Sequence, residues 1–165
     1  MRFFKETQRF DQWWLHLLNL IVLGILVLST YKAFATKNLD TPERNILILT
    51  FISVLIVLGV VYSIRLTTQI DEKGVHFRFF PFQINYKVIL WTDMDKCYTR
   101  TYSPIKEFGG WGYRGIGRKK KAYNIRGNKS IPIALKTGNM LLIGTQRPKD
   151  AQQTINRYLK EDERI

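Results

Sequence analysis

Two long apolar segments near the start of the chain constrain its fold more than any other feature. They run from Gln12 to Tyr31 and from Asn45 to Ile64, and neither contains Asp, Glu, Lys or Arg. At a rise of about 1.5 Å per residue, a helix of about 20 residues crosses a hydrocarbon core about 30 Å thick. We therefore expect two transmembrane helices, at about residues 12–32 and 45–65, in an N-terminal membrane unit of residues 1–66.

The first apolar segment and the residues before it have two interpretations. Basic residues precede the segment, and Ala33–Ala35 resemble a signal-peptide cleavage site. The apolar run is long for a signal peptide, so an uncleaved anchor is favoured. Met1–Asp11 mixes phenylalanines with basic side chains directly ahead of two tryptophans, a composition typical of a membrane surface. We expect Met1–Asp11 to be an interfacial segment.

The basic residues beside the apolar segments predict the orientation of the chain. Three precede the first segment (Arg2, Lys5, Arg9), three follow the second (Arg65, Lys73, Arg78) and three lie between the two (Lys32, Lys37, Arg44). An excess of Lys and Arg marks the cytoplasmic side. The expected location is the cytoplasmic (inner) membrane, with two spans and both termini cytoplasmic. The lone Cys97 cannot form an intramolecular disulfide, which suits a reducing compartment.

From Arg65 onward the chain changes to short segments of alternating polarity. Val75, Phe77 and Phe79 alternate with polar side chains, and the same period of two recurs in Ile131–Leu135. Turn-forming residues separate about seven such segments. Pro148 then opens an amphipathic helix near the C-terminus. We expect residues 67–165 to form one cytoplasmic domain, so that the chain is a membrane-anchored α+β protein.

A glycine-rich stretch in this domain matches the spacing of a dinucleotide-binding turn. Gly110, Gly112 and Gly115 spell G-x-G-x-x-G. Such a turn needs a helix directly after it and an acidic residue about 20 positions further on. No helical period follows here, and after Glu107 the next acidic residue is Asp150. The spacing is therefore interpreted as coincidence, and we expect no cofactor.

Other enzymatic sites lack the necessary residues. The chain has two histidines, His16 in an apolar segment and His76 in an expected strand, too few for a histidine metal cluster or a serine–histidine–aspartate triad. Asp93 and Asp95 could act as a carboxylate pair, but a solvated loop is favoured. We expect neither a metal site nor an enzyme.

An excess of positive charge distinguishes the middle of the domain. The chain has 26 basic and 13 acidic residues, and between Arg100 and Lys136 the one acidic residue is Glu107. The candidate contact residues are Arg114, Arg118, Lys119, Lys120 and Lys121. Beside an anionic leaflet each is worth about 1 kcal/mol. A solvated hairpin tip gives the same pattern, and nucleic acid is disfavoured because no binding motif accompanies the charge.

Polar residues in the first apolar segment form a second candidate site. Gln12, His16 and Asn19 are spaced so that they share one face of a helix. Ionisable groups within a membrane mark proton or substrate paths in some proteins. The favoured interpretation is hydrogen bonding to the partner helix or to interfacial water.

Three segments carry a resemblance to a known family. GGWGYRGIG, KAYNIRGNKSIPIAL and LLIGTQRP, followed by one helix, resemble the bacterial pleckstrin-homology-like (PH-like) domains found behind two membrane helices. The resemblance covers about Gly110–Leu159. It implies a seven-stranded β-sandwich or partly open barrel with a C-terminal α-helix, and brings no catalytic residue. Phosphoinositide-binding relatives carry a basic first hairpin, whereas Asp71–Gly74 here is acidic, so diffuse attraction to anionic lipid is expected instead.

These features predict a non-enzymatic, membrane-anchored interaction or scaffold module. Its expected partners are the membrane, anionic lipid headgroups, a second copy of the chain or another membrane protein. The alternative is an accessory subunit of a membrane transport or signalling complex, in which the stripe of Gln12, His16 and Asn19 acts within the bilayer.

Overall fold

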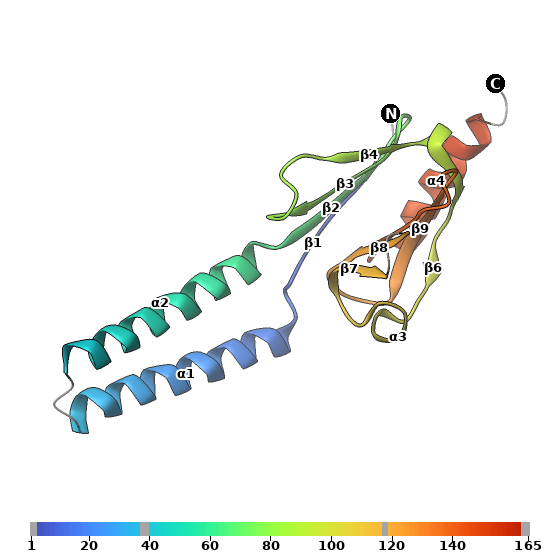
Figure 1. Ribbon diagram of the computed structural model, residues 1–165. Helices are drawn as coiled ribbons and strands as arrows, with labels where there is room; N and C mark the ends of the chain where they lie inside the picture. The colour runs from blue at the N-terminus through green and yellow to red at the C-terminus, as the bar shows by residue number, and fades with distance from the viewer. Residues whose placement is uncertain (1–2, 37–39, 117–118, 163–165) are drawn as a thin grey trace. The chain divides into compact units, whose positions relative to one another are not determined.

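The computed structural model describes residues 3–36, 40–116 and 119–162. The chain divides into two compact units, Phe10–Ser63 and Met1–Arg9 together with Ile64–Ile165. The first unit is a pair of helices, and the second is a β-domain built from two sheets (Figure 1). The expected pair of apolar helices, the β-region after them and the C-terminal helix are confirmed.

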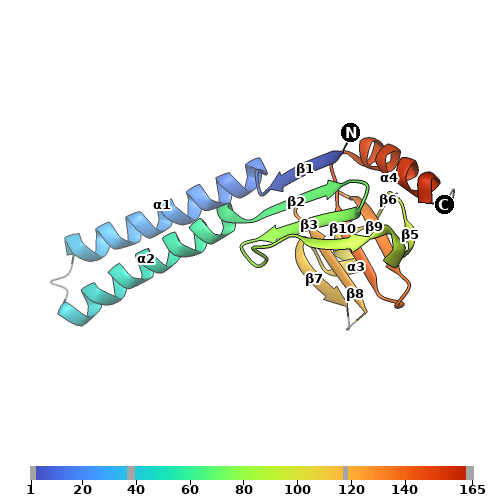
Figure 2. The same ribbon diagram turned by 90° about the horizontal axis from the view of Figure 1, so that it is seen from above.

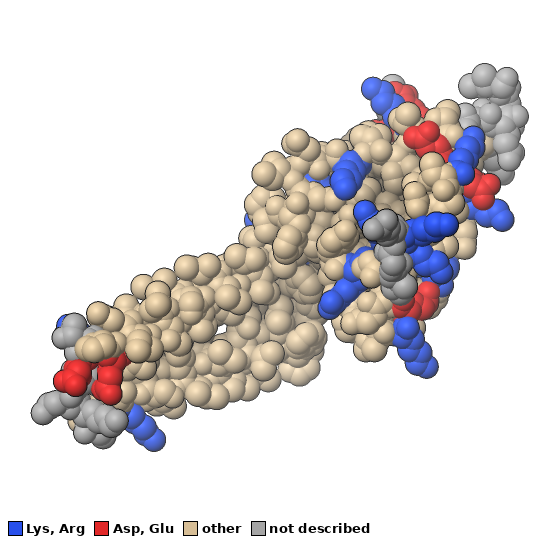
Figure 3. Space-filling model, viewed as in Figure 1, with Lys and Arg blue, Asp and Glu red and all other residues tan. Residues whose placement is uncertain are grey.

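The helical unit consists of α1 (Trp13–Thr36) and α2 (Thr41–Ser63). Within them, Trp13–Ala35 and Pro42–Ser63 are long and apolar enough to cross a membrane. On the face that Figure 3 shows, uncharged side chains cover both helices, and charged ones gather at the end where the helices are connected. Most of the apolar side chains are exposed to the surroundings instead of being buried between the helices.

The first sheet has four antiparallel strands in the order β1-β2-β3-β4. They are β1 (Phe4–Arg9), β2 (Arg65–Ile70), β3 (Gly74–Phe80) and β4 (Lys87–Leu90). The helix pair is thus inserted in the chain between two neighbouring strands, with Arg9 opposite Arg65. Cleavage near Ala35 would remove β1 from the sheet, so the strand pairing favours the uncleaved chain.

β1 differs from the interfacial segment expected over Met1–Asp11. Phe4, Glu6 and Gln8 alternate with exposed residues and face the domain interior. The two polar side chains are hydrogen-bonded there: Gln8 Nε2 donates to the Gly144 carbonyl at 2.8 Å, and Glu6 accepts from Thr145 Oγ1 at 2.6 Å. Hydrogen bonds to the domain thus compensate the burial of the Glu6 carboxylate and the Gln8 amino group, whereas the buried Gln8 Oε1 atom accepts no hydrogen bond from the described residues.

The second sheet has six strands in the order β5-β9-β10-β8-β7, with β6 also paired to β9. They are β5 (Met94–Cys97), β6 (Arg100–Thr101), β7 (Gly112–Ile116), β8 (Lys120–Asn124), β9 (Lys129–Leu135) and β10 (Met140–Gly144). β8 and β10 are parallel, and the other pairs are antiparallel. The described residues therefore form ten strands in two open sheets and no closed barrel. Nine of these strands begin at or after Arg65, where about seven were expected.

The core lies between the two sheets, which Figures 1 and 2 show as facing layers. Tyr123 of β8 links them, since its ring centre lies 4.9 Å from that of Phe77 and 5.9 Å from that of Phe79. The other fully buried side chains of this core include Leu66, Ile70, Val75, Ile131, Ile133 and Ile143. The opposite face of the second sheet is covered by α3 (Pro104–Phe108), where Phe108 packs with Tyr102, Ala122 and Leu142.

The C-terminal helix α4 (Pro148–Asp162) packs against β9, β1 and β2. Its residues Ala151 and Ile155 are fully buried, and its Tyr158 ring stacks on Trp91 at 6.1 Å between centres. Trp91 begins the short 3-10 helix η1 (Trp91–Asp93) that leads from β4 to β5. α4 therefore closes the core beside the first two strands.

Candidate functional site

The predicted basic residues divide between two faces of the second sheet. Side chains alternate along a strand, and Tyr123 of β8 faces the core, so Lys121 lies on the core-side face. Lys120 shares the opposite face with Ala122, as does Arg114, which pairs with Ala122 across β7 and β8. Arg118 lies outside the described residues. The run therefore does not form one continuous patch.

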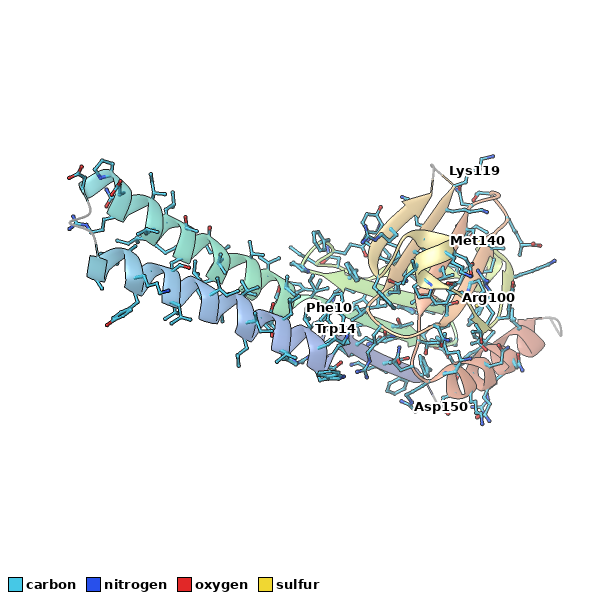
Figure 4. The ribbon with its side chains drawn as sticks, turned by 90° about the horizontal axis from the view of Figure 1, so that it is seen from below. Phe10, Trp14, Arg100, Lys119, Met140 and Asp150 are labelled. Carbon is cyan, nitrogen blue, oxygen red and sulfur yellow. The ribbon has the colours of Figure 1, made fainter. Side chains whose placement is uncertain are left out.

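Lys119 and Lys121 border a cleft of about 340 Å³ at one end of the domain. Its apolar walls come from both sheets: Phe77, Val88, Ile89, Tyr123, Leu135, Met140 and Leu141. Figure 4 shows Lys119 and Met140 at this end, and the Met140 N–H donates to the Lys119 carbonyl at 2.8 Å. The cleft thus joins the start of β8 and β10 to the edge of the first sheet.

A third lysine, Lys87, completes the cationic border of the cleft. Lys87 is the first residue of β4 and lies opposite Phe77 in the sheet register. Directly opposed residues share a face of the sheet, so Lys87 lies on the inner face of β4. Phe77, on the neighbouring strand β3, lies on the same face. Sequence reasoning missed Lys87 because it stands alone in an apolar segment, more than 30 residues before the basic run.

The positive charge of the cleft is not compensated by nearby carboxylates. No acidic residue is among the described residues that line it, and within the described ranges no ion pair involves Lys87, Lys119 or Lys121. Arg100, by contrast, pairs with Glu107 at 2.6 Å, and this hydrogen bond lowers the pKa of the Glu107 carboxyl. The three cleft lysines remain available to an anion.

Tyr123 forms part of the cleft wall and is not an acid or base near neutral pH. Burial, together with the neighbouring Tyr113, raises the pKa of Tyr123 to about 12. Gln83 Nε2 donates a hydrogen bond to the phenol oxygen at 3.2 Å, and the Tyr113 ring stacks on the Tyr123 ring at 4.8 Å. The cleft therefore offers positive charge at its border and apolar surface inside.

Two residues of the predicted polar stripe meet on one tyrosine of the other helix. The His16 Nδ1 atom lies 2.8 Å from Tyr62 Oη, and Asn19 Nδ2 donates to the same oxygen at 2.9 Å. The His16 and Tyr62 rings are also stacked, with centres 5.4 Å apart. Gln12 precedes α1, and its carbonyl accepts the first amide hydrogen bonds of that helix. Two of the three residues of the stripe, His16 and Asn19, thus contact the partner helix.

The sequence analysis did not identify Tyr62 as a partner of His16, although its position along the chain indicates it. In an antiparallel helix pair whose connection is centred near residue 39, residue 16 is level with residue 62. Counting outward from the connection in this way would have found the partner of His16.

The glycine-rich stretch lies in a strand context. Gly110 and Gly112 have positive φ angles of 124° and 106° between α3 and β7. The Gly112 N–H donates to Asn124 Oδ1 at 2.8 Å, and β7 then pairs with β8. A strand, and not the helix of a dinucleotide turn, follows these glycines. Asp93 ends η1 and Asp95 lies on β5, and both are exposed.

Comparisons of the chain with protein-family models, curated proteins and solved structures give no match. The PH-like resemblance therefore rests on the sequence segments quoted above. The parallel β8–β10 pair and the strand β1 ahead of the helices are features that the resemblance did not predict.

Proposed function

We propose that this protein is a non-enzymatic, membrane-anchored interaction module with a PH-like domain. The observation that carries this proposal is the antiparallel pairing of β1 with β2, on either side of two helices that are long and apolar enough to cross a membrane. The helices thereby form an insertion in the chain between two paired strands of the domain. Their role is to fix the domain at a membrane.

Short connections join the strands to the helices along the chain. Residues 10–12 separate β1 from α1, and Ile64 alone separates α2 from β2. With both helices crossing the bilayer, β1 and β2 lie on the same side. The bias of basic residues favours the cytoplasmic side of the inner membrane for both termini.

The basic surface supports a role at an anionic leaflet. Arg114 and Lys120 are exposed on the face of the second sheet that is turned away from the core. Each basic side chain held near an anionic leaflet contributes about 1 kcal/mol. Anionic lipid headgroups, a second copy or a membrane-protein partner are the proposed contacts of the module.

Labelling of single cysteines in membrane vesicles tests the anchoring. In a Cys97→Ser background, Lys149→Cys places a thiol on the exposed start of α4, and Asp40→Cys places one at the connected end of the helices. A membrane-impermeant maleimide should label Lys149→Cys only in inside-out vesicles and Asp40→Cys only in right-side-out vesicles. Labelling of both from the same side would contradict the proposal.

Hydrogen exchange in nanodiscs tests the lipid contact. The segment from Gly112 to Asn124 should exchange more slowly in anionic than in zwitterionic nanodiscs at low salt, and high salt should remove the difference. The double variant Arg114→Gln with Lys120→Gln should also remove it, whereas Lys149→Gln should not. Equal exchange in both lipid compositions would exclude a headgroup contact at this surface.

The contact of His16 and Asn19 with Tyr62 supports a second candidate function, that of an accessory subunit of a transport or signalling complex. An imidazole bonded to a phenol inside a membrane can relay a proton. A cellular phenotype for His16→Leu at normal abundance and insertion, reproduced by Tyr62→Phe, would favour this function. A silent His16→Leu variant would count against it.

A further inference from the structure

The cleft bordered by Lys87, Lys119 and Lys121 separates polar from apolar surface. Its interior walls are core residues: Phe77 is 2% exposed, Tyr123 3% and Leu141 8%. The three lysines at its border are exposed. A ligand that matches this arrangement has a hydrocarbon part and a negatively charged end.

Lys87 is placed where an interior side chain is expected. The neighbouring strand β3 has Phe77 at the opposed position, on the face that packs against the second sheet. Lys87 is nevertheless exposed and lines the cleft. An anion bound in the cleft would therefore lie beside a solvated ammonium group.

The size of the cleft restricts the ligand. Its volume of about 340 Å³ is near the lower end of the range of about 300–1,000 Å³ for small-molecule pockets. A second cleft of about 360 Å³ shares Val88, Ile89 and Leu135 with the first. The second cleft also has Asp93, Lys136 and Thr137 in its lining, so the apolar surface that continues from the first cleft consists of Val88, Ile89 and Leu135. This strip suits one hydrocarbon chain better than two chains side by side.

We propose that this cleft binds a fatty acid, with the hydrocarbon chain along Ile89, Leu135 and Leu141 and the carboxylate against Lys87, Lys119 and Lys121. The choice of an anionic head follows from charge complementarity, since the described lining of the first cleft holds three lysines and no carboxylate, whereas Asp93 lines the adjoining cleft. The inference does not depend on the orientation of the helices or on headgroup contacts at Arg114 and Lys120. Failure of the anchoring proposal would therefore not contradict fatty-acid binding, and the reverse also holds.

Photolabelling of the full chain in a non-ionic detergent tests the site. The probe is a fatty acid with a diazirine in its hydrocarbon chain, and modified residues are located by mass spectrometry. We expect modification of peptides that contain residues 87–90 and 135–141, in addition to α1 and α2, which contact detergent-dissolved probe. The helix peptides provide an internal measure of probe concentration.

Two sets of variants separate the charge from the apolar walls. Replacing Lys87, Lys119 and Lys121 together with Gln should lower cleft labelling about tenfold or more, because each lost contact involves two charges. The matched control is Lys106→Gln, which removes an exposed charge from α3, on the opposite face of the second sheet, and should leave cleft labelling unchanged. Ile89→Trp should abolish cleft labelling by filling the cleft, and near-UV circular dichroism checks that this variant is folded.

Three outcomes would overturn the proposal. The first is labelling of the wild-type chain in α1 and α2 only. The second is equal cleft labelling by the fatty acid and by its uncharged methyl ester, which would show an apolar groove without preference for an anion. The third is displacement of the probe by a lysophospholipid at lower concentration than by a fatty acid, which would assign the cleft to a different head group.

Discussion

Replacing Glu6 with Ala tests whether β1 is an integral strand of the domain. Both carboxylate oxygens of Glu6 accept hydrogen bonds: Oε2 from Thr145 Oγ1 at 2.6 Å and Oε1 from the Gln146 N–H at 2.7 Å. The side chain is 8% exposed, so water cannot fully replace it. These bonds connect the N-terminal strand to the segment that leads into α4.

The expected magnitude follows from the number and type of bonds lost. A hydrogen bond to a charged group contributes about 1.5–3 kcal/mol net. Two are lost in Glu6→Ala, but Gln146 is exposed and its amide regains water, so we expect a loss of about 3 kcal/mol in the free energy of unfolding. At roughly 4 °C per kcal/mol for a domain of this size, Tm falls by about 12 °C.

Thermal unfolding of the full chain in detergent, followed by near-UV circular dichroism, measures this change. Lys5→Ala is the matched control, since it removes a charge from the exposed face of the same strand and should change the free energy of unfolding by no more than about 0.5 kcal/mol. Thr145→Ala combined with Glu6→Ala should cost less than the sum of the single changes, because the two residues share a bond. Equal Tm values for the Glu6 and Lys5 variants would refute the docking of β1.

Three further predictions address the chemistry and packing of the β-domain. Burial raises the pKa of the Cys97 thiol to about 12. Iodoacetamide should therefore modify Cys97 in the folded chain at pH 8 roughly a thousandfold more slowly than it modifies a thiol of ordinary pKa. Rapid alkylation detected by mass spectrometry without denaturant would contradict this. A Cβ on Gly74 would lie 1.9 Å from the Ile89 carbonyl oxygen. Gly74→Ala should therefore lower the free energy of unfolding by about 3 kcal/mol or more in a denaturant titration. Gly138 has open space around it, so Gly138→Ala should lower the free energy of unfolding by about 1 kcal/mol. Burial acts to raise the pKa of Asp71, but hydrogen bonds from two backbone amides and the pairing with a histidine outweigh it and lower that pKa below 3.8. The carboxylate therefore stabilises the fold above pH 3.8 and loses this effect as pH falls through the lowered pKa. Asp71→Asn should reduce Tm at about pH 6 and leave it unchanged at about pH 2. A Tm difference that is independent of pH would show that the charge is not responsible.

Apolar patterning was sufficient to predict the two helices, the amphipathic C-terminal helix and the strands with alternating apolar residues. It failed for β1, whose buried face is Phe4, Glu6 and Gln8. Two of these three side chains are polar, and their hydrogen-bond partners lie more than 130 residues away in the chain. A local pattern cannot report that a distant loop will satisfy a buried glutamate, so the segment was interpreted as part of the membrane surface.

The candidate site was predictable only in part for a similar reason. The basic run identified Lys119 and Lys121, but a count of charges does not distinguish them from Lys120, which the strand alternation places on the other face. Lys87 and Leu141 join the site through packing of the two sheets. That packing depends on contacts between segments far apart in the sequence. The periodicity of residues within one strand does not predict such contacts.

If both helices cross a membrane, as proposed, the position of β1 links membrane insertion to folding. The strand precedes α1 and pairs with β2, which follows α2, so the first sheet is then completed only when both strands are on the same side of the membrane. A chain in which one helix crosses and the other does not would separate β1 from β2. Thr145 and Gln146 would then lack the carboxylate of Glu6. The loss of about 3 kcal/mol expected for Glu6→Ala is therefore a lower limit for the free energy by which the fold favours two crossings over one.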